Sequence, residues 1–378
     1  MALTRRTLVA AGLAAPALIG LGRAAQAATT LKLSHQFPGG TIDEGDFRDR
    51  MCRKFAAAVK ERSKGALEVQ VYPGSSLMKT NAQFSAMRKG ALDMSLYPLP
   101  YAGGEVPETN IGLMPALVTS YQQAMAWKAA PVGRKLTEIL LAKNIVMVSW
   151  VWQAGGVASR ERPLVRPEDA KGLKVRGGSR EMDLMMKAAG AATLSLPSNE
   201  SYAAMQTGAC DAVITSSTSL ISFRLEELAK SLTSGRGRSY WFMLEPIMMS
   251  KAIFDGLPKD QRDLIMTVGA ELESFGQEGA QADDTRVEQI FGKAGAKVET
   301  LDEATLNRWR DIARDSAWKD YAAKSSSCAE MLKLAEAHRS HREQPRRVFL
   351  EDGLQIDGGC HSRERCRQRG EELAEARA

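Results

Sequence analysis

Apolar and polar positions along this chain repeat with two different periods, and the two periods alternate. Residues 31–36, LKLSHQ, alternate with period two and predict a strand. Residues 43–63 carry an apolar side chain at every fourth position, which predicts an amphipathic helix with one buried stripe: Phe47, Met51, Phe55 and Val59. Residues 67–73, LEVQVYP, predict a second strand. The order strand, helix, strand predicts a mostly parallel sheet covered by helices.

One short pattern occurs twice in the chain. Residues 84–96 read FSAMRKGALDMSL, and residues 202–214 read YAAMQTGACDAVI. In each copy a helical stretch ends at a glycine and an aspartate opens the next strand: Gly90 with Asp93, then Gly208 with Asp211. Glycine ends a helix at little cost because it adopts the left-handed conformation. The repeat therefore predicts two similar α/β lobes.

Two apolar segments predict where the chain passes between the lobes. Residues 145–152, IVMVSWVW, predict one strand that leads to a possible hinge at Gly155 and Gly156, and residues 240–250 predict another strand. We expect a first lobe from residues 28–154 and 238–285, an inserted second lobe from 155–237, and C-terminal helices over 286–337 that pack on the lobes.

The N-terminus has the features of an export signal. An arginine pair, Arg5 and Arg6, precedes an apolar run from Leu8 to Leu21 and a small-residue site at Ala25–Ala27. The apolar run is too short to span a bilayer comfortably. We expect residues 1–27 to be a twin-arginine-like signal peptide and the mature protein to be soluble in the periplasm.

Composition narrows the function classes. The chain has 378 residues, enough for two domains, and a formal net charge of +6, half of which lies in the predicted signal. The remaining bias is too weak to indicate nucleic-acid binding, and no basic stripe with interleaved aromatic residues is present. Five irregularly spaced cysteines do not form a disulfide framework, so we expect Cys52 and Cys210 to be buried free thiols.

The last 41 residues, 338–378, differ in composition from the rest. They hold nine arginines, no lysine, three histidines and two cysteines. A metal site from these histidines and cysteines would need a spacing that fits no standard pattern. We expect a solvated or disordered Arg-rich tail.

Several motifs together resemble one protein family. PEDAKGLKVR at residues 167–176 and YAAMQTGACDAV at 202–213 are similar to the DctP-type solute-binding proteins of TRAP transporters, and the resemblance covers about residues 29–336. It implies a two-lobed periplasmic binding protein of type II-like α/β fold. Each lobe would hold a mixed, mostly parallel sheet flanked by helices, with crossing strands and a long connecting helix. The lobes would close on an organic acid and deliver it to a TRAP membrane permease.

The resemblance implies that Arg176, which ends GLKVR, grips the ligand carboxylate. A guanidinium fork suits this role because it donates two parallel charge-assisted hydrogen bonds. The alternative is an exposed arginine at a strand end. By position, Gln36 at the end of the first strand and Ser198 ahead of the second copy of the repeat are further ligand contacts.

Four other residues are candidates for the ligand site. Thr215 and Ser216 offer hydroxyl groups to a ligand, or serve equally well as the N-cap of a following helix. Trp152 is a candidate wall against an apolar part of the ligand. Gly156 stands where sialic-acid-binding relatives carry a second arginine, which puts a second anionic group on the ligand in doubt.

These features predict binding without catalysis, and no cofactor. We expect a small monocarboxylate, with a C4 dicarboxylate as the second choice, and the sequence leaves open whether a cation accompanies the ligand. The alternatives are an exported enzyme or a sensory receptor domain on the same scaffold. No H-E-x-x-H, G-x-S-x-G, Walker A or strand-linked G-x-G-x-x-G motif supports an enzyme.

Overall fold

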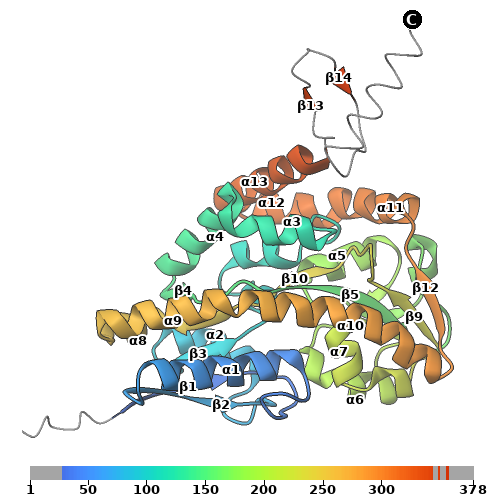
Figure 1. Ribbon diagram of the computed structural model, residues 1–378. Coiled ribbons are helices and arrows are strands. Elements are labelled where there is room, and N and C mark those ends of the chain that lie inside the picture. Colours follow the sequence, from blue (N-terminus) through green and yellow to red (C-terminus); the bar gives the residue numbers. More distant parts are fainter. Residues whose placement is uncertain (1–27, 344–347, 350–354, 357–378) are drawn as a thin grey trace, which may run out of the picture.

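A computed structural model describes residues 28–343, 348–349 and 355–356 of the chain. These residues form two lobes, each built on its own β-sheet and flanked by helices (Figure 1). The expected two-lobed α/β architecture is confirmed. The predicted signal peptide at 1–27 and most of the predicted tail lie outside the described residues.

The first lobe holds a five-stranded sheet with the strand order β2-β1-β3-β11-β4. Strand β1 pairs in parallel with both β2 and β3, whereas β11 is antiparallel to β3 and β4. The strands are β1 (Thr29–Ser34), β2 (Leu67–Tyr72), β3 (Met94–Leu96), β4 (Ile145–Met147) and β11 (Ile247–Ser250). The helices before β5 are α1 (Phe47–Arg62), α2 (Thr80–Arg88), α3 (Tyr121–Ala126) and α4 (Pro131–Ala142). All four apolar residues of the predicted helical stripe are buried in α1.

The second lobe holds a seven-stranded sheet with the order β12-β9-β5-β8-β6-β7, and β10 pairs with β5 outside that path. Its parallel pairs are β12-β9, β8-β6 and β6-β7, and its central strand β5 is antiparallel to β8, β9 and β10. The strands are β5 (Trp152–Ser159), β6 (Lys174–Arg176), β7 (Ala192–Thr193), β8 (Ala212–Ser216), β9 (Ser231–Ser234), β10 (Phe242–Leu244) and β12 (Lys297–Thr300). The helices between them are α5 (Arg180–Ala188), α6 (Ser201–Gln206) and α7 (Ser217–Ser222).

The duplicated sequence pattern forms the same helix–glycine–strand unit in both lobes. Gly90 and Gly208 have φ angles of 72° and 74°, the left-handed conformation expected at the helix ends. The Oδ2 atom of Asp93 accepts a hydrogen bond of 2.7 Å from the backbone N–H of Lys32 in β1, and Asp211 accepts one of 2.8 Å from Lys174 in β6. Each aspartate therefore ties the start of its own strand to the parallel strand beside it.

The chain crosses between the two sheets at two places where the sequence predicted uninterrupted strands. Residues 145–152 divide into β4 of the first sheet and the start of β5 of the second, and residues 240–250 divide into β10 and β11 around Pro246. The predicted hinge glycines, Gly155 and Gly156, lie inside β5 rather than in a connection. The apolar sequence pattern continues through both crossings because most of the crossing residues are buried.

The C-terminal part of the chain packs against both lobes. The long helix α10 (Glu273–Lys293) runs across both lobes and contacts α1, α7 and β5 (Figure 1). The segment expected to be helical from residue 286 onward also contains β12, which pairs in parallel with β9. The other elements are α8 (Lys251–Gly256), α9 (Lys259–Glu271), α11 (Glu303–Ala313), a π-helical turn (Arg314–Trp318), α12 (Lys319–Lys324), α13 (Ser326–Glu343) and the antiparallel pair β13 (Val348–Phe349) and β14 (Gln355–Ile356). Helix α13 therefore continues past the boundary expected at residue 337.

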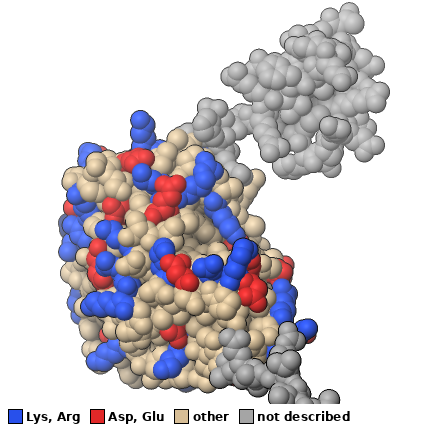
Figure 2. Space-filling model, turned by 90° about the vertical axis from the view of Figure 1, so that its left-hand side faces the viewer, with Lys and Arg blue, Asp and Glu red and all other residues tan. Residues whose placement is uncertain are grey.

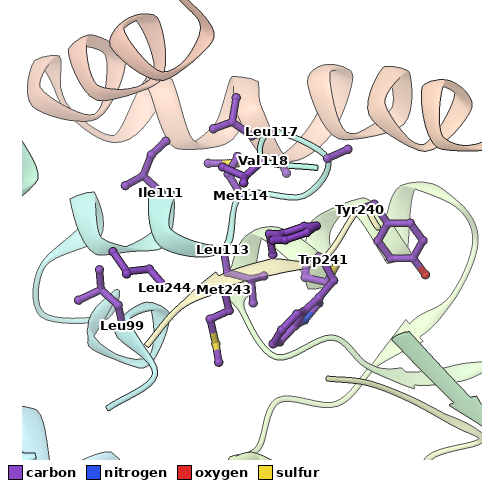
Figure 3. Packing of buried hydrophobic residues seen from close by; sticks show 14 of the residues in the cluster. Leu99, Ile111, Leu113, Met114, Leu117, Val118, Tyr240, Trp241, Met243 and Leu244 are labelled. Carbon is purple, nitrogen blue, oxygen red and sulfur yellow. The ribbon is translucent and has the colours of Figure 1, made fainter. Parts of the chain in front are cut away.

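Apolar packing joins the crossing strands to the helices around them. Leu113 lies beside Trp241 and Met243 of the crossing segment in one core cluster, and Leu117 lies next to Met114 and Val118 in the same cluster (Figure 3). Cys52 and Cys210 are buried free thiols, as predicted. On the face in Figure 2, acidic and basic side chains are interspersed. In the described part of the chain, no helix combines the length and apolar character that a membrane span needs.

Candidate functional site

Arg176 occupies the last position of β6 at the boundary between the lobes. Its guanidinium is buried, with 1% of the residue exposed. Its Nε donates to the carbonyl of Leu196 at 3.0 Å, and its Nη1 donates to the carbonyl of Ile214 at 2.9 Å. Its Nη2 donates to the hydroxyl of Tyr101, which belongs to the first lobe, at 2.7 Å. The side chain is therefore held in one orientation by groups from both lobes.

Glycine at position 178 makes room for this guanidinium. Gly178 has a φ of +91°, and a Cβ built there would lie 2.9 Å from Nη1 of Arg176. Gly177 and Gly178 separate Arg176 from α5, whose N-cap is Ser179. Any larger residue at position 178 would displace the guanidinium and strain the backbone.

Tyr101 links the lobes beside Arg176. It lies in a 3-10 helix (Leu99–Ala102), and its hydroxyl oxygen accepts from Arg176 and, at 3.1 Å, from the backbone N–H of Ser198. A phenolic oxygen has two lone pairs and one proton. Because both bonds use it as an acceptor, its O–H stays available to donate to a bound molecule. Ser198 is thus near Arg176, as predicted, but it contributes its backbone.

An open cavity of about 320 Å³ lies between the lobes next to this contact. Tyr101 and Leu196, two of the groups that hold Arg176, line it together with the start of α5 at Arg180. The Arg180 guanidinium is half exposed and pairs with Asp320. The remaining lining residues are Asn81, Pro100, Gly103, Gly104, Asn110, Gly178, Ser179, Ser195 and Pro197.

Gln36 lies at the end of β1 and is almost fully buried. Its Oε1 accepts from Thr80 Oγ1 at 3.4 Å, and its Nε2 has no hydrogen-bond partner among the described residues. The hydroxyl of Tyr97, which follows β3, is also buried without a partner there. Tyr97 packs edge-on against the cavity-lining Tyr101, with ring centroids 6.0 Å apart, and Thr80 precedes the cavity-lining Asn81.

Ser216 caps a helix in the structure, which is one of the two roles predicted for it. Its Oγ accepts from the backbone N–H of Ser219 at 3.1 Å, so Ser216 is the N-cap of α7. Thr215 is buried in β8, where it pairs with Gly156 of β5. Neither residue lines the cavity next to Tyr101.

Trp152 and Gly156 are not brought to this cavity, so the structure does not support their expected roles there. Trp152 is buried edge-on against Trp127, with ring centroids 5.1 Å apart, and it lines a separate cavity beside α10. A Cβ on Gly156 would lie 2.4 Å from the carbonyl of Thr233 in β9. The missing side chain at position 156 therefore permits close strand packing.

Sequence reasoning did not single out Tyr101. It lies in the segment LPYAGG, which has no strand or helix periodicity, and its role depends on a partner 75 residues away. The glycines that follow it, Gly103 and Gly104, line the cavity. In the sequence, this glycine pair was the only signal that another group could come close to the backbone next to Tyr101.

The site carries positive charge. Among the described residues, Arg176 has no carboxylate within ion-pair distance. Burial raises the pKa of nearby Asp183 to about 7, although the positive charge of Arg176 opposes this rise. Asp183 is therefore only partly ionised near neutral pH, and no ion pair joins it to Arg176 among the described residues. No group of three or more His, Cys, Asp and Glu side chains arranged to hold a metal ion occurs in the described part of the chain.

Known proteins share this sequence and architecture. Bacterial extracellular solute-binding proteins, family 7 (DctP), match residues 41–325. A solute-binding protein from Albidiferax ferrireducens is 68% identical over 308 residues, which cover 82% of this chain and 91% of that protein. A TRAP periplasmic solute-binding protein from Rhodoferax ferrireducens, solved with bound malonate, is 67% identical, with a TM-score of 0.82 and coverage of 82% of this chain and 99% of that one.

A more distant structure shares the fold. A TRAP periplasmic solute-binding protein from Shewanella oneidensis, solved with bound succinate, is 22% identical with a TM-score of 0.72, and the match covers 82% of this chain and 99% of that one. The family match spans both lobes and agrees with the resemblance carried by GLKVR and the repeated pattern. The chain therefore belongs to the DctP family of TRAP solute-binding proteins, which are transport proteins and not enzymes.

Proposed function

We propose that this protein captures a small organic acid between its lobes, with the ligand carboxylate on Arg176, and delivers it to a TRAP-type membrane permease. The observation that carries this proposal is a buried guanidinium without a carboxylate partner among the described residues. A buried cation is costly unless an anion compensates it. A ligand carboxylate supplies that anion.

The hydrogen-bonding capacity of Arg176 supports the same role. A guanidinium has five N–H groups. Leu196, Ile214 and Tyr101 accept three of them, which leaves one N–H on each terminal nitrogen for a carboxylate. A carboxylate bound in this way also receives the free O–H of Tyr101. Closure of the lobes removes water and strengthens these contacts.

The relative solved with malonate supports a small dicarboxylate as the ligand. That relative is 67% identical, and the cavity of about 320 Å³ has room for a three-carbon dicarboxylate and for larger acids. Arg180 lines the cavity but is already paired with Asp320, so a second carboxylate would compete with Asp320 for it. Comparison of malonate with its monoamide, malonamate, therefore distinguishes a dicarboxylate from a monocarboxylate ligand.

Export and delivery complete the proposal. The arginine pair and apolar run within residues 1–27 support export by the twin-arginine route, with release of the mature chain into the periplasm. The membrane partner is the permease of a TRAP transporter. Arg176 balances one carboxylate, and a cation that accompanies the ligand would balance the second carboxylate of a dicarboxylate.

Calorimetric titration of the purified mature protein with malonate and malonamate tests the site. We expect Arg176→Ala to weaken binding by about 100-fold or more, because it removes a charged, hydrogen-bonded anchor. Arg176→Lys keeps the positive charge but cannot donate two parallel hydrogen bonds, so its affinity should lie between those of the native protein and Arg176→Ala. Arg308→Ala, at a half-exposed arginine paired with Glu168, is the matched control. Unchanged affinity in Arg176→Ala, or chemical turnover of the ligand, would contradict the proposal.

A further inference from the structure

We propose that Arg48 is a positioning residue that fastens the two lobes together at the α10 side of the molecule and thereby raises ligand affinity without touching the ligand. The proposal rests on the proposed function, in which the ligand is held between closed lobes. It concerns Arg48, Ser216 and Ser219, which form a contact distinct from that of Arg176 and Tyr101.

Arg48 is rigidly oriented within the first lobe. It is the second residue of α1, follows the N-cap residue Asp46, and is 1% exposed. Its Nε and Nη2 donate to the two carboxylate oxygens of Asp46 at 2.9 and 2.6 Å. Its guanidinium carbon lies 3.5 Å from the centre of the Phe37 ring, just after β1. The two hydrogen bonds to Asp46 and the contact with the Phe37 ring fix the direction in which the remaining nitrogen, Nη1, points.

That nitrogen reaches the second lobe. Nη1 of Arg48 donates to Ser219 Oγ at 3.0 Å and lies 3.4 Å from Ser216 Oγ. These two hydroxyls are 3.0 Å apart at the start of α7, which follows β8 of the second sheet. Nη1 also lies 3.4 Å from Oε2 of Glu245, between the crossing strands β10 and β11. One buried side chain thus joins both lobes and the crossing segment.

The charge of Arg48 argues against a direct ligand contact. Asp46 binds it through both oxygens, and Glu245 is a second carboxylate within ion-pair distance. A further anion would have to displace a bidentate partner from a buried site. Arg48 therefore does not bind the ligand. Its role between the lobes is the hydrogen bond to Ser219.

In this proposal, opening of the lobes breaks the bond between Arg48 and Ser219, and a bond of that kind contributes to ligand affinity. Ligand binding draws the protein towards the closed state, so each contact that opening breaks makes closure more favourable. Removal of one such contact lowers the affinity by about three- to tenfold. Because the contact forms after the ligand enters, its loss should speed dissociation and leave association nearly unchanged.

Ser219→Ala isolates this contact because it leaves the pair between Arg48 and Asp46 intact. We expect the affinity for malonate to fall about three- to tenfold, with the change in the dissociation rate measured by stopped flow. Small-angle scattering should report a larger radius of gyration for Ser219→Ala at subsaturating malonate. Ser231→Ala is the matched control, since Ser231 is a buried serine of the same lobe whose Oγ has no partner in the described structure.

The outcomes separate this inference from the proposed function. If the wild-type protein binds malonate and Arg176→Ala abolishes binding, but Ser219→Ala matches Ser231→Ala in dissociation rate, the inference about Arg48 is wrong and the proposed function stands. If Ser219→Ala lowers only the melting temperature, its role is structural and the inference is also wrong. If the wild-type protein binds no organic acid, the proposed function itself fails.

Discussion

The two buried arginines at the lobe boundary have opposite surroundings. Arg48 and Arg176 are equally buried, and each bonds to the lobe opposite its own. Arg48 is compensated by two carboxylates, whereas Arg176 is held by carbonyl and hydroxyl oxygens and has no carboxylate partner among the described residues. Burial alone therefore does not identify a ligand anchor. A buried charge that has no carboxylate partner among the described residues does identify a ligand anchor.

Stability measurements should separate the two arginines most strongly. Arg48→Ala should lower the free energy of unfolding by about 3–5 kcal/mol, because it leaves Asp46 buried without its partner. Arg176→Ala should lower it by at most about 1–2 kcal/mol, since the lost hydrogen bonds are offset by relief of an uncompensated buried cation. Urea unfolding without ligand measures both. Equal losses would mean that Arg176 has an unrecognised anionic partner.

The pH dependence of stability tests how much compensation Arg48 needs. Burial raises the pKa of Glu245 to about 7, although Arg48 opposes the rise, while the pKa of Asp46 stays below its usual value because its bonds to Arg48 outweigh the opposing effect of burial. The folded protein holds the Glu245 proton more tightly than the unfolded chain does. Glu245 therefore makes its full contribution to the free energy of unfolding below about pH 4.3, and this contribution is lost as the pH rises towards 7.

Glu245→Gln, which stays neutral and keeps the shape of the side chain, should remove this dependence. We expect it to raise the free energy of unfolding by on the order of 2–3 kcal/mol at pH 8, relative to the native chain, and to change it little at pH 4 to 5. Denaturant unfolding at the two pH values provides the comparison. A destabilised variant at pH 8 would show that Arg48 requires both carboxylates.

Removal of one hydroxyl should have the smallest effect. Tyr101→Phe deletes the oxygen that accepts from Arg176 and Ser198, so we expect malonate affinity to fall about five- to tenfold, with a stability loss of about 1 kcal/mol. Titration calorimetry measures the affinity. Tyr202→Phe, whose hydroxyl bonds to Glu227 within the second lobe, is the control and should bind malonate normally.

The repeated scaffold was predictable from the sequence because its signals are local. Gly90 and Gly208 end helices in the left-handed conformation wherever they occur, and the apolar stripe of α1 needs only its own periodicity. Arg176 was accessible through the family motif. The sequence did not reveal the bonds from Asp93 and Asp211 to neighbouring strands, which depend on strand pairing.

The remaining features depend on contacts between distant segments. Arg48 looks like an ordinary first-turn arginine beside an apolar stripe, and only the fold brings it to Ser219, 171 residues away. Trp152 is a candidate in the sequence because it stands four residues before Gly156, near the predicted hinge, yet closeness along the chain does not place a side chain, and in the structure Trp152 lines the cavity beside α10. Gly156 was assigned by position alone, although the close approach of β9 explains it.

Helix α10 constrains how the molecule can open. Ala280 belongs to the apolar core of the first lobe, and Val287 and Phe291, about two and three turns further on, belong to a core of the second. Separation of the lobes by translation would expose one of these cores to water. The molecule should instead rotate about an axis along this helix, so that the polar contacts between the lobes, those of Tyr101 and of Arg48 with Ser219, separate while the apolar packing along α10 is kept.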